Sequence, residues 1–245
     1  MTETLPRTTR IARQFNGPNH SGNGGYVGGL IGARVAGDTD SATRVDLRKP
    51  PPLERDLVWR DHGDGVDLLD GDIAVASGRS GELEAEDPLV APVSVEAARA
   101  AREAYEGYHD HPFPRCFACG SDRGPGDGLR LFSGPLPDGR MACPWTPHDP
   151  FVDADGLLAA PFMWAALDCP GGWAARIKTK PMVLARMTAA LYRRPRLGEE
   201  CVVIGALREV VRRKNHTATA LYDADGELIG RADQIWVAID IVEFS

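Results

Sequence analysis

Two ten-residue segments, one in each half of the chain, share the pattern that most constrains the fold. Val45–Glu54 is an alternating strand turned by basic residues and proline before a leucine, and Ala190–Glu199 repeats this pattern. Around each segment the elements run in the same order, namely helix, strand, proline turn, strand and strand. Because such self-similarity is typical of repeated units, we predict an internal duplication. Several duplicated α+β folds satisfy this order.

The two expected helices are unusual in composition. In the first half, Asn16–Val35 is a glycine-rich loop that runs into a helical pattern. Each glycine within a helix costs about 1 kcal/mol relative to alanine, so we predict a buried helix that packs closely on a sheet or another helix. In the second half, Pro161 suits the first turn of a helix, and Pro170–Gly172 is a typical helix stop.

An acidic residue, Asp168, closes the otherwise apolar run of the second helix. Burying a carboxylate is costly unless it is paired or used in chemistry. Asp168 is therefore either a capping or ion-paired residue or a functional one.

The remaining elements follow from alternation and turn residues, and residues 81–93 are acidic and proline-bearing, as in a linker. We predict units over 1–93 and 128–245, joined by a linker helix and a Cys-x-x-Cys loop over 94–127. The expected strands are Thr9–Phe15, Thr43–Leu47, Leu57–Arg60, Ile73–Ser77, Met182–Tyr192, Glu200–Val211, His216–Tyr222 and Leu228–Ile241, with a hairpin over 128–145 and a helix over Val95–Tyr108.

Composition argues against several classes of protein. The net charge of −7 disfavours nucleic acid as the main partner, because phosphate binding needs clustered positive charge. No apolar run approaches the roughly 20 residues of a membrane helix, and Met1–Arg7 does not begin a signal peptide, so we expect no membrane partner. Five cysteines, an odd number, favour a cytoplasmic location over a disulfide framework.

A long helix wrapped by an antiparallel meander, occurring twice, resembles the double form of the hotdog fold. Many hotdog thioesterases open the central helix with His-Gly-Gly and carry an acid seven positions after the second glycine. Here Asn23-Gly24-Gly25 leads to Gly32, with Asn23 in place of the histidine, whereas Ala159-Ala160-Pro161 leads to Asp168. The resemblance implies an α+β pseudo-dimer of two tandem hotdog units with one composite active site.

Further motifs resemble members of the same superfamily. Cys116-Phe-Ala-Cys-Gly, followed by Gly128-Leu, is similar to the opening of phenylacetate-type hotdog thioesterases. In the acyl-CoA thioesterase II family the site comprises an aspartate on the second helix, a threonine on the next strand and a glutamine on the final strand. Asp168 and Gln234 match two of these positions, and Thr188 lies a few residues beyond the third.

The resemblance implies hydrolysis of acyl-CoA or another acyl thioester. In apolar surroundings Asp168 would have a raised pKa and act as general base or direct nucleophile, while Gln234 and Thr188 would hold the attacking water. The N–H of Gly24 would point from a helix N-terminus at the thioester oxygen. The expected catalytic residues are Asp168, Gln234, Thr188 and Gly24, and the expected substrate-binding residues are Asn23, Gly25, Arg193 and Arg194.

Each assignment has a structural alternative. Gly24 and Gly25 would be equally expected if they only allow close helix packing. Gln234 would then be a surface residue of an edge strand, and Thr188 a residue chosen for its high strand propensity. The arginines of 193–196 suit either coenzyme A phosphates or a solvated turn.

Cysteine spacing suggests zinc, because Cys-x-x-Cys-Gly is one half of a zinc ribbon. The candidate ligands are His111, Cys116, Cys119 and Cys143. A second Cys-x-x-Cys is missing, Cys143 falls in a strand, and the hotdog proteins of the resemblance do not generally need metal. We therefore expect no metal and no cofactor, and we expect Cys169 to be a small buried residue without a histidine partner.

We therefore predict an acyl-CoA hydrolase. The first alternative is a non-catalytic protein that binds acyl thioesters or other small molecules. A hydratase or dehydratase is disfavoured, because that chemistry needs a histidine near the carboxylate and none follows Asp168 before His216. Association of the chain into a homo-oligomer is a further expectation, since single hotdog dimers often associate.

Overall fold

The computed structural model describes residues 6–36, 41–83 and 87–240. The α-helices are α1 (Gly24–Ala36), α2 (Val95–Glu103) and α3 (Ala160–Ala174). None of these described helices is long and apolar enough to cross a membrane. The strands are β1 (Thr8–Arg10), β2 (Thr43–Leu47), β3 (Asp56–His62), β4 (Gly65–Asp70), β5 (Ile73–Ser80), β6 (Gly134–Pro135), β7 (Met141–Trp145), β8 (Met182–Leu191), β9 (Cys201–Val211), β10 (Lys214–Asp223) and β11 (Leu228–Ala238).

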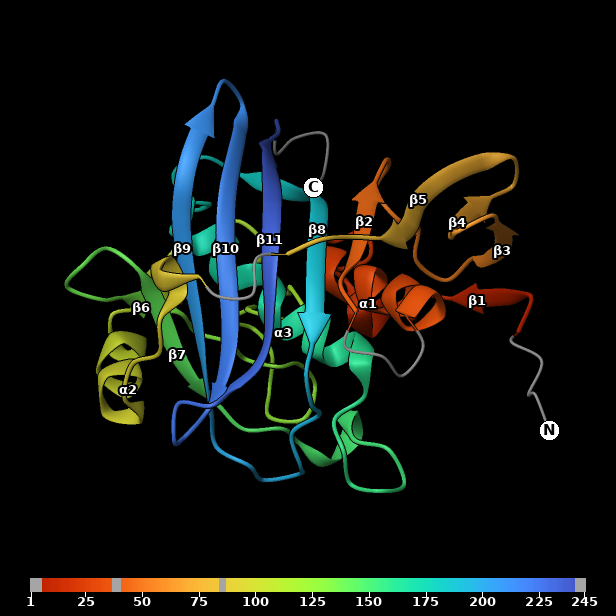
Figure 1. Ribbon diagram of the computed structural model, residues 1–245. Helices are drawn as coiled ribbons and strands as arrows, with labels where there is room; N and C mark the ends of the chain where they lie inside the picture. Colours follow the sequence, from red (N-terminus) through yellow and green to blue (C-terminus); the bar gives the residue numbers. More distant parts are fainter. Residues whose placement is uncertain (1–5, 37–40, 84–86, 241–245) are drawn as a thin grey trace.

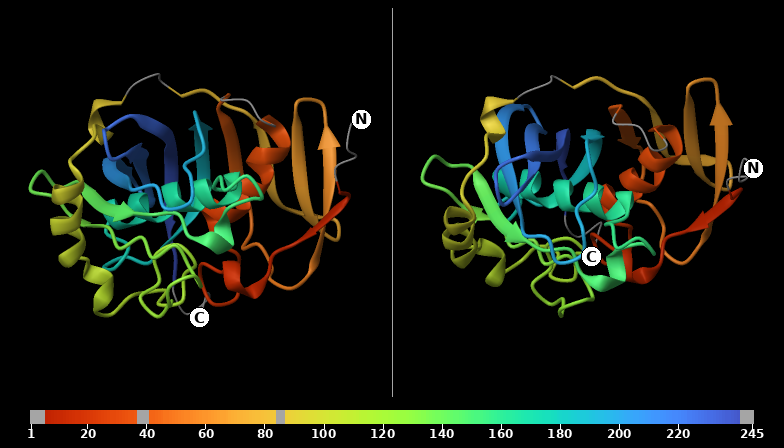
Figure 2. Two further views of the ribbon diagram at one scale, coloured as in Figure 1. Left: turned by 90° about the horizontal axis from the view of Figure 1, so that it is seen from below. Right: turned by 60° about the horizontal axis from the view of Figure 1, so that its bottom comes forward.

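All the named strands belong to one antiparallel sheet, in the order β1-β3-β4-β5-β2-β8-β11-β10-β9-β7-β6. From the central pair outward, β2-β5-β4-β3-β1 on one side mirrors β8-β11-β10-β9-β7 on the other. The central strands β2 and β8 pair antiparallel, with Val45 opposite Met187. The two decapeptides of the predicted repeat begin in these two strands, and α1 and α3 lie on the same face of the sheet (Figures 1 and 2).

The glycines of α1 allow it to approach α3 closely. A Cβ on Gly25 would lie 2.5 Å from the Cβ of Asp168, and one on Gly29 would lie 2.4 Å from the Cα of Pro161. Most of α1 is buried, as the glycine content predicted. The glycines are therefore required because a side chain has no room between the two helices.

The predicted helix stop at Pro170–Gly172 is wrong, because α3 continues to Ala174. Pro170 removes one helical N–H and its ring disturbs the preceding turn, so contacts outside the helix help to hold that turn in place. The carbonyl of Leu167 accepts hydrogen bonds from Gln234 Nε2 at 2.6 Å and Thr219 Oγ1 at 2.8 Å. The sheet thus supplies these contacts, and the glycines let the helix lie close to it.

Four other elements differ from the prediction. Residues 43–80 contain four strands rather than three, because β4 pairs on both sides and this pairing outweighs the low strand propensity of its aspartates. In the segment expected as a strand over Thr9–Phe15, strand β1 ends at Arg10 and a 3-10 turn follows. The helix expected over Val95–Tyr108 ends at Glu103. The last strand ends at Ala238, and its predicted end at Ile241 lies outside the described residues.

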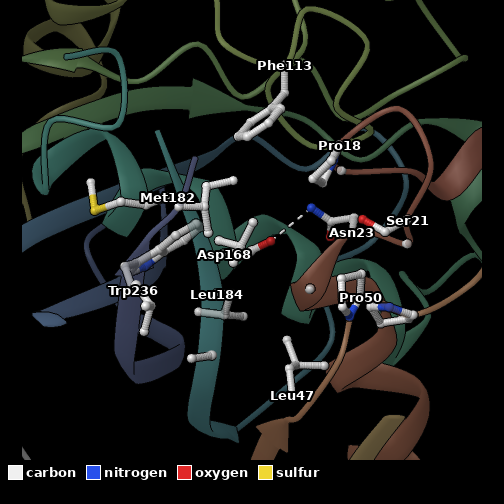
Figure 3. Close-up of a pocket in the computed structure, with 18 of the residues that line it drawn as sticks. Pro18, Ser21, Asn23, Leu47, Pro50, Phe113, Asp168, Met182, Leu184 and Trp236 are labelled. Carbon is white, nitrogen blue, oxygen red and sulfur yellow. Dashed lines mark hydrogen bonds between the residues drawn. The ribbon is translucent and has the colours of Figure 1, made fainter. Parts of the chain in front are cut away.

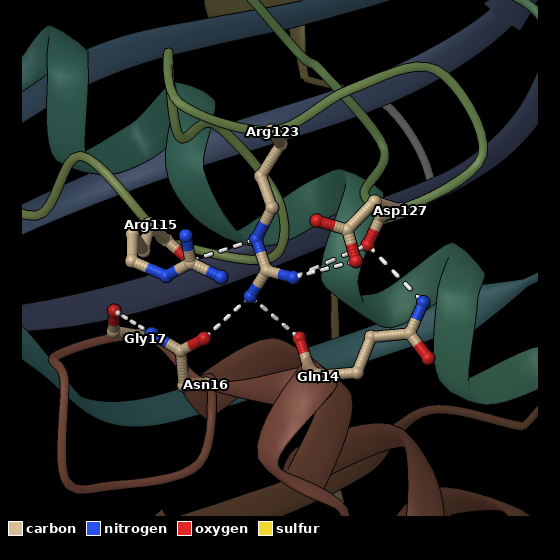
Figure 4. A network of polar contacts seen from close by, with 6 residues as sticks. All are labelled: Gln14, Asn16, Gly17, Arg115, Arg123 and Asp127. Atoms are coloured by element: carbon tan, nitrogen blue, oxygen red, sulfur yellow. Dashed lines mark hydrogen bonds and ion pairs between the residues drawn. The ribbon is translucent and has the colours of Figure 1, made fainter.

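The segment predicted as a linker packs into the body of the molecule. Helix α2 contacts β7, and the Cys-x-x-Cys loop that follows is buried. Arg123, 4% exposed, anchors this loop to the chain before α1 (Figure 4). Its guanidinium donates hydrogen bonds to the carbonyls of Arg115 and Gln14, to Asn16 Oδ1 and to Asp127.

The contact between α3 and β11 makes a testable prediction. A Cβ on Gly171 would lie 1.8 Å from Gln234 Oε1 and 2.7 Å from Thr217 Oγ1. We expect Gly171→Ala to lower the free energy of unfolding by about 1–3 kcal/mol through overpacking. Urea unfolding measures this, and Gly124→Ala is the control because nothing lies within 4 Å of its Cβ position. Equal losses in both variants would contradict the packing described here.

Candidate active site

A cavity of about 310 Å³ opens where the N-terminus of α1, the middle of α3 and the start of β8 meet (Figure 3). The turn after β2 and the end of β11 complete its wall. Most of its lining is apolar, and a carboxylate and an amide lie among the apolar groups. The lining includes Leu47, Phe113, Met182, Leu184, Trp236, Asn23 and Asp168.

Asp168 holds one carboxylate oxygen fixed and leaves the other without a partner. Its side chain comes from α3, and the residue is 1% exposed. Oδ2 accepts hydrogen bonds from Asn23 Nδ2 at 2.8 Å and from the Gly25 N–H at 3.0 Å. Oδ1 is buried and has no hydrogen-bond partner among the described residues. This asymmetry orients the carboxylate while leaving one oxygen to react with a bound molecule.

Burial raises the pKa of Asp168 to about 7. The Gly25 N–H and the Asn23 amide lower this pKa, and the negative charge of Cys116 raises it. The raised pKa predicted from the apolar sequence therefore agrees with the structure. A carboxyl group with a pKa near neutrality can both accept and release a proton.

Asn23 joins the two helices. Its Oδ1 accepts a hydrogen bond from the Tyr26 N–H at 2.8 Å, as an N-cap does, and its Nδ2 donates to Asp168. The amide thus begins α1 and holds the acid of α3 at the same time. The structure brings together these residues from opposite ends of the chain.

The two glycines after Asn23 have different roles. The Gly25 N–H is committed to Asp168, so it is not available to a substrate as the sequence analysis expected. Gly24 lines the cavity at the first turn of α1, and no acceptor for its N–H is found in the described chain. A Cβ on Gly24 would lie 2.9 Å from the Cβ of Leu184, so close packing also requires glycine there.

Gln234 does not face the cavity, and neither sequence interpretation of it holds. It is 2% exposed on β11, which lies inside the sheet between β8 and β10. Its Nε2 donates to the carbonyls of Leu167 and Asp168, and its Oε1 accepts from Thr217 Oγ1 and Trp236 Nε1. An amide makes four hydrogen bonds at most, so Gln234 cannot also hold a water molecule. It anchors α3 instead.

Thr188 is also remote from the cavity. It pairs with Arg44 of β2 and Asp233 of β11, and it is not among the residues of the cavity wall. Successive side chains of a strand point to opposite faces, which places Thr188 on the face of Arg186 rather than that of Met187. The predicted water-holding role is therefore wrong, and the alternative of a strand-forming residue agrees with the structure.

Arg193 and Arg194 are not at the cavity either. Both follow the end of β8, whereas the cavity lies at its start. Arg193 forms salt bridges with Glu199 and Asp223, and Arg194 binds Asp153 and the carbonyl of Leu158. The structure therefore does not bring these two arginines to the cavity, and both already have anionic partners elsewhere.

Three cations that the sequence analysis missed line the cavity instead. They are Arg48, Lys49 and Arg213, and all are exposed. In the described part of the chain none of them forms a salt bridge. The predicted repeat aligns Arg48 and Lys49 with Arg193 and Arg194, so it indicates a basic turn in each half but not which of the two turns faces the cavity.

The anchoring role of Gln234 is testable. We expect Gln234→Ala to lower the free energy of unfolding by about 2–4 kcal/mol, because buried carbonyls of α3 lose their donors. Urea unfolding gives the value, with Gln14→Ala as the control that removes a single hydrogen bond nearer the surface. Unchanged stability in Gln234→Ala would refute the anchoring role.

No protein-family model matches the sequence. No curated protein matches it either. Solved structures match it over nearly the whole chain. An acyl-CoA thioesterase II, TesB2 of Mycobacterium marinum, has 13% identity and a TM-score of 0.59, covering 97% of this chain and 95% of its own. A TesB protein of Mycobacterium avium subspecies paratuberculosis has 12% identity and a TM-score of 0.62, covering 97% and 96%.

A third matching structure is described by its fold. It is a protein with a hotdog fold from Alicyclobacillus acidocaldarius, at 11% identity and a TM-score of 0.55, covering 97% of this chain and 95% of its own. At such identities the likeness establishes the architecture. The hotdog fold predicted from the two helices and their meanders is confirmed.

Proposed function

We propose that this hotdog protein is an acyl-CoA hydrolase, built from two tandem hotdog units of common origin that share one composite active site. One observation carries the proposal: a buried acid from α3, Asp168, is held at the N-terminus of α1 beside an apolar cavity. The strand order that is mirrored about β2 and β8 supports the duplication. The names of the structural neighbours support the reaction class.

In the proposed reaction, Asp168 acts as general base. Its unpaired Oδ1 accepts a proton from a water molecule, and the water oxygen attacks the thioester carbonyl carbon. The N–H of Gly24 and the α1 macrodipole stabilise the resulting oxyanion. The carbon–sulfur bond then breaks, and the thiolate takes up the proton from Asp168 as the acid product forms.

The cavity wall supports an acyl thioester as substrate. Apolar side chains such as Leu184, Met182 and Trp236 favour an aliphatic or aromatic acyl group. At the same cavity Lys49 and Arg213 carry positive charge without an anionic partner in the described chain. An acyl group joined to an anionic carrier such as coenzyme A would place its apolar part against the apolar side chains and its negative charge near the two cations.

The general base is tested by Asp168→Asn. Because asparagine keeps the shape but cannot take up the proton, we expect the turnover of acyl-CoA to fall by about 10²- to 10⁴-fold. Release of free thiol from a panel of acyl-CoA substrates measures turnover. Asp155→Asn, at an exposed position, is the control for the change in charge. Full activity in Asp168→Asn would remove the hydrolase mechanism.

The cations at the cavity are tested through KM. We expect Lys49→Ala combined with Arg213→Ala to raise KM for acyl-CoA by about fivefold, and the increase to shrink in high salt because exposed charges are screened. The single variant Arg193→Ala is the control, since this arginine is paired far from the cavity. An equal rise of KM in Arg193→Ala would contradict this assignment.

A second candidate is an acyl-thioester-binding protein without turnover. It is favoured by the positions of Gln234 and Thr188, because neither of these groups expected to hold water lies at the cavity. It predicts a rise in Tm with acyl-CoA but no release of thiol by the wild-type protein. No histidine lines the described cavity, which continues to disfavour a hydratase.

A further inference from the structure

Three cysteine side chains meet in the wall of the cavity. Cys116 and Cys119 come from the loop after α2, and Cys169 comes from α3 next to the acid. Their sulfur atoms all lie within 4.8 Å of one another, and the Sγ atoms of Cys116 and Cys169 are 3.7 Å apart. All three are buried and form no disulfide.

The sulfur spacing matches a metal site. Zinc binds thiolate sulfur at about 2.3 Å in tetrahedral geometry, so two ligand sulfurs are about 3.8 Å apart. The 3.7 Å between Cys116 and Cys169 is close to this edge. One edge of the sulfur triangle therefore already has the length found in a tetrahedral zinc site, and the other two, at no more than 4.8 Å, need only a small movement to bind an ion.

The backbone holds the Cys116–Cys119 turn in a fixed conformation. The Gly120 N–H donates to the carbonyl of Cys116 at 2.8 Å. A Cβ on Gly120 would lie 2.6 Å from the carbonyl oxygens of Cys116 and Pro114, so only glycine fits. Arg123 then fixes the loop against the segment before α1 (Figure 4). The two sulfurs are thus positioned without a metal ion.

Buried N–H groups face these sulfurs. Asn23 Nδ2 lies 3.8 Å from Cys116 Sγ. The indole of Trp173 is 3% exposed, and its Nε1–H interacts with the Cys119 thiol but has no acceptor in good hydrogen-bond geometry in the described chain. A metal-bound thiolate is a stronger acceptor than a thiol, so a bound ion would satisfy this otherwise orphaned donor.

The ligand set differs from the one considered in the sequence analysis. Cys143 lies away from the cluster, with its sulfur 3.3 Å from Ser133 Oγ. His111 Nε2 is 3.5 Å from Cys119 Sγ, but the Phe113 N–H donates to His111 Nδ1. This leaves the histidine proton on Nε2, so His111 cannot bind a metal through that atom.

We propose that Cys116, Cys119 and Cys169 bind one zinc ion. Zinc binds the sulfurs as thiolates, so each cysteine that is still a thiol releases its proton, and the fourth coordination position is left to water or another small ligand in the cavity. The ion would fix the loop to α3 beside Asp168. This site goes beyond the proposed hydrolase. It replaces the expectation of no metal, which rested on the missing second Cys-x-x-Cys, on the place of Cys143 in a strand and on the resemblance to hotdog proteins.

The test is the zinc content of the full-length chain expressed in zinc-supplemented medium. We expect about one zinc ion per wild-type chain, and X-ray absorption at the zinc edge should show three sulfur neighbours at about 2.3 Å. Cys169→Ser should lose nearly all the zinc. Cys143→Ser and Cys201→Ser are matched controls, because each removes a buried thiol outside the cluster and should keep the zinc.

Two results would overturn the proposal. One is wild-type protein that takes up no zinc while its thiols stay free or while Cys116 and Cys169 form a disulfide, detected by intact mass. The other is bound zinc whose absorption spectrum shows fewer than three sulfur neighbours. The absorption measurement needs no variant, so it decides the question even where Cys169→Ser fails to fold. Zinc content is read without substrate, so it fails or succeeds independently of thioester hydrolysis.

Discussion

The structure depends on how closely α1 and α3 approach one another at Asp168. A carboxylate that is 1% exposed is tolerated because Asn23 and the Gly25 N–H both donate to one of its oxygens. The same approach requires Gly25 to lack a side chain, since its Cβ would lie 2.5 Å from that of Asp168. Gly25 is therefore required both for the close packing of the two helices and for the hydrogen bond that stabilises the buried carboxylate.

Asp168 is held from two sides. Its side chain is oriented by the start of α1, while its main-chain carbonyl accepts a hydrogen bond from Gln234 of the sheet at 3.1 Å. Pro170 weakens α3 one turn from its end, because it has no N–H to donate within the helix, and the contact with Gln234 holds this part of the helix on the sheet. Gln234, which lies outside the cavity wall, can thus control the position of Asp168, which lies in it.

The sequence predicted the architecture and the acid, and its failures have one physical cause. Glycine content, alternation and an acid within an apolar run are local signals, and they led correctly to α1, to the meanders and to the unusual environment of Asp168. The partners of a side chain are set by segments distant in sequence. Pro170 resembles a helix stop unless the donors on β10 and β11 are known, and Gln234 resembles a site residue unless its four bonds are seen. Likewise a repeat offers two copies of each basic turn, and only tertiary structure decides that Lys49 faces the cavity.

The pairing of β2 with β8 has a consequence for the protein in dilute solution. Because both strands belong to one polypeptide, closure of the sheet is an intramolecular event whose equilibrium does not depend on the concentration of the protein. A site assembled from two separate subunits dissociates when its host becomes scarce. Here Asn23 and Asp168 belong to the same chain, so dilution of the protein does not separate them.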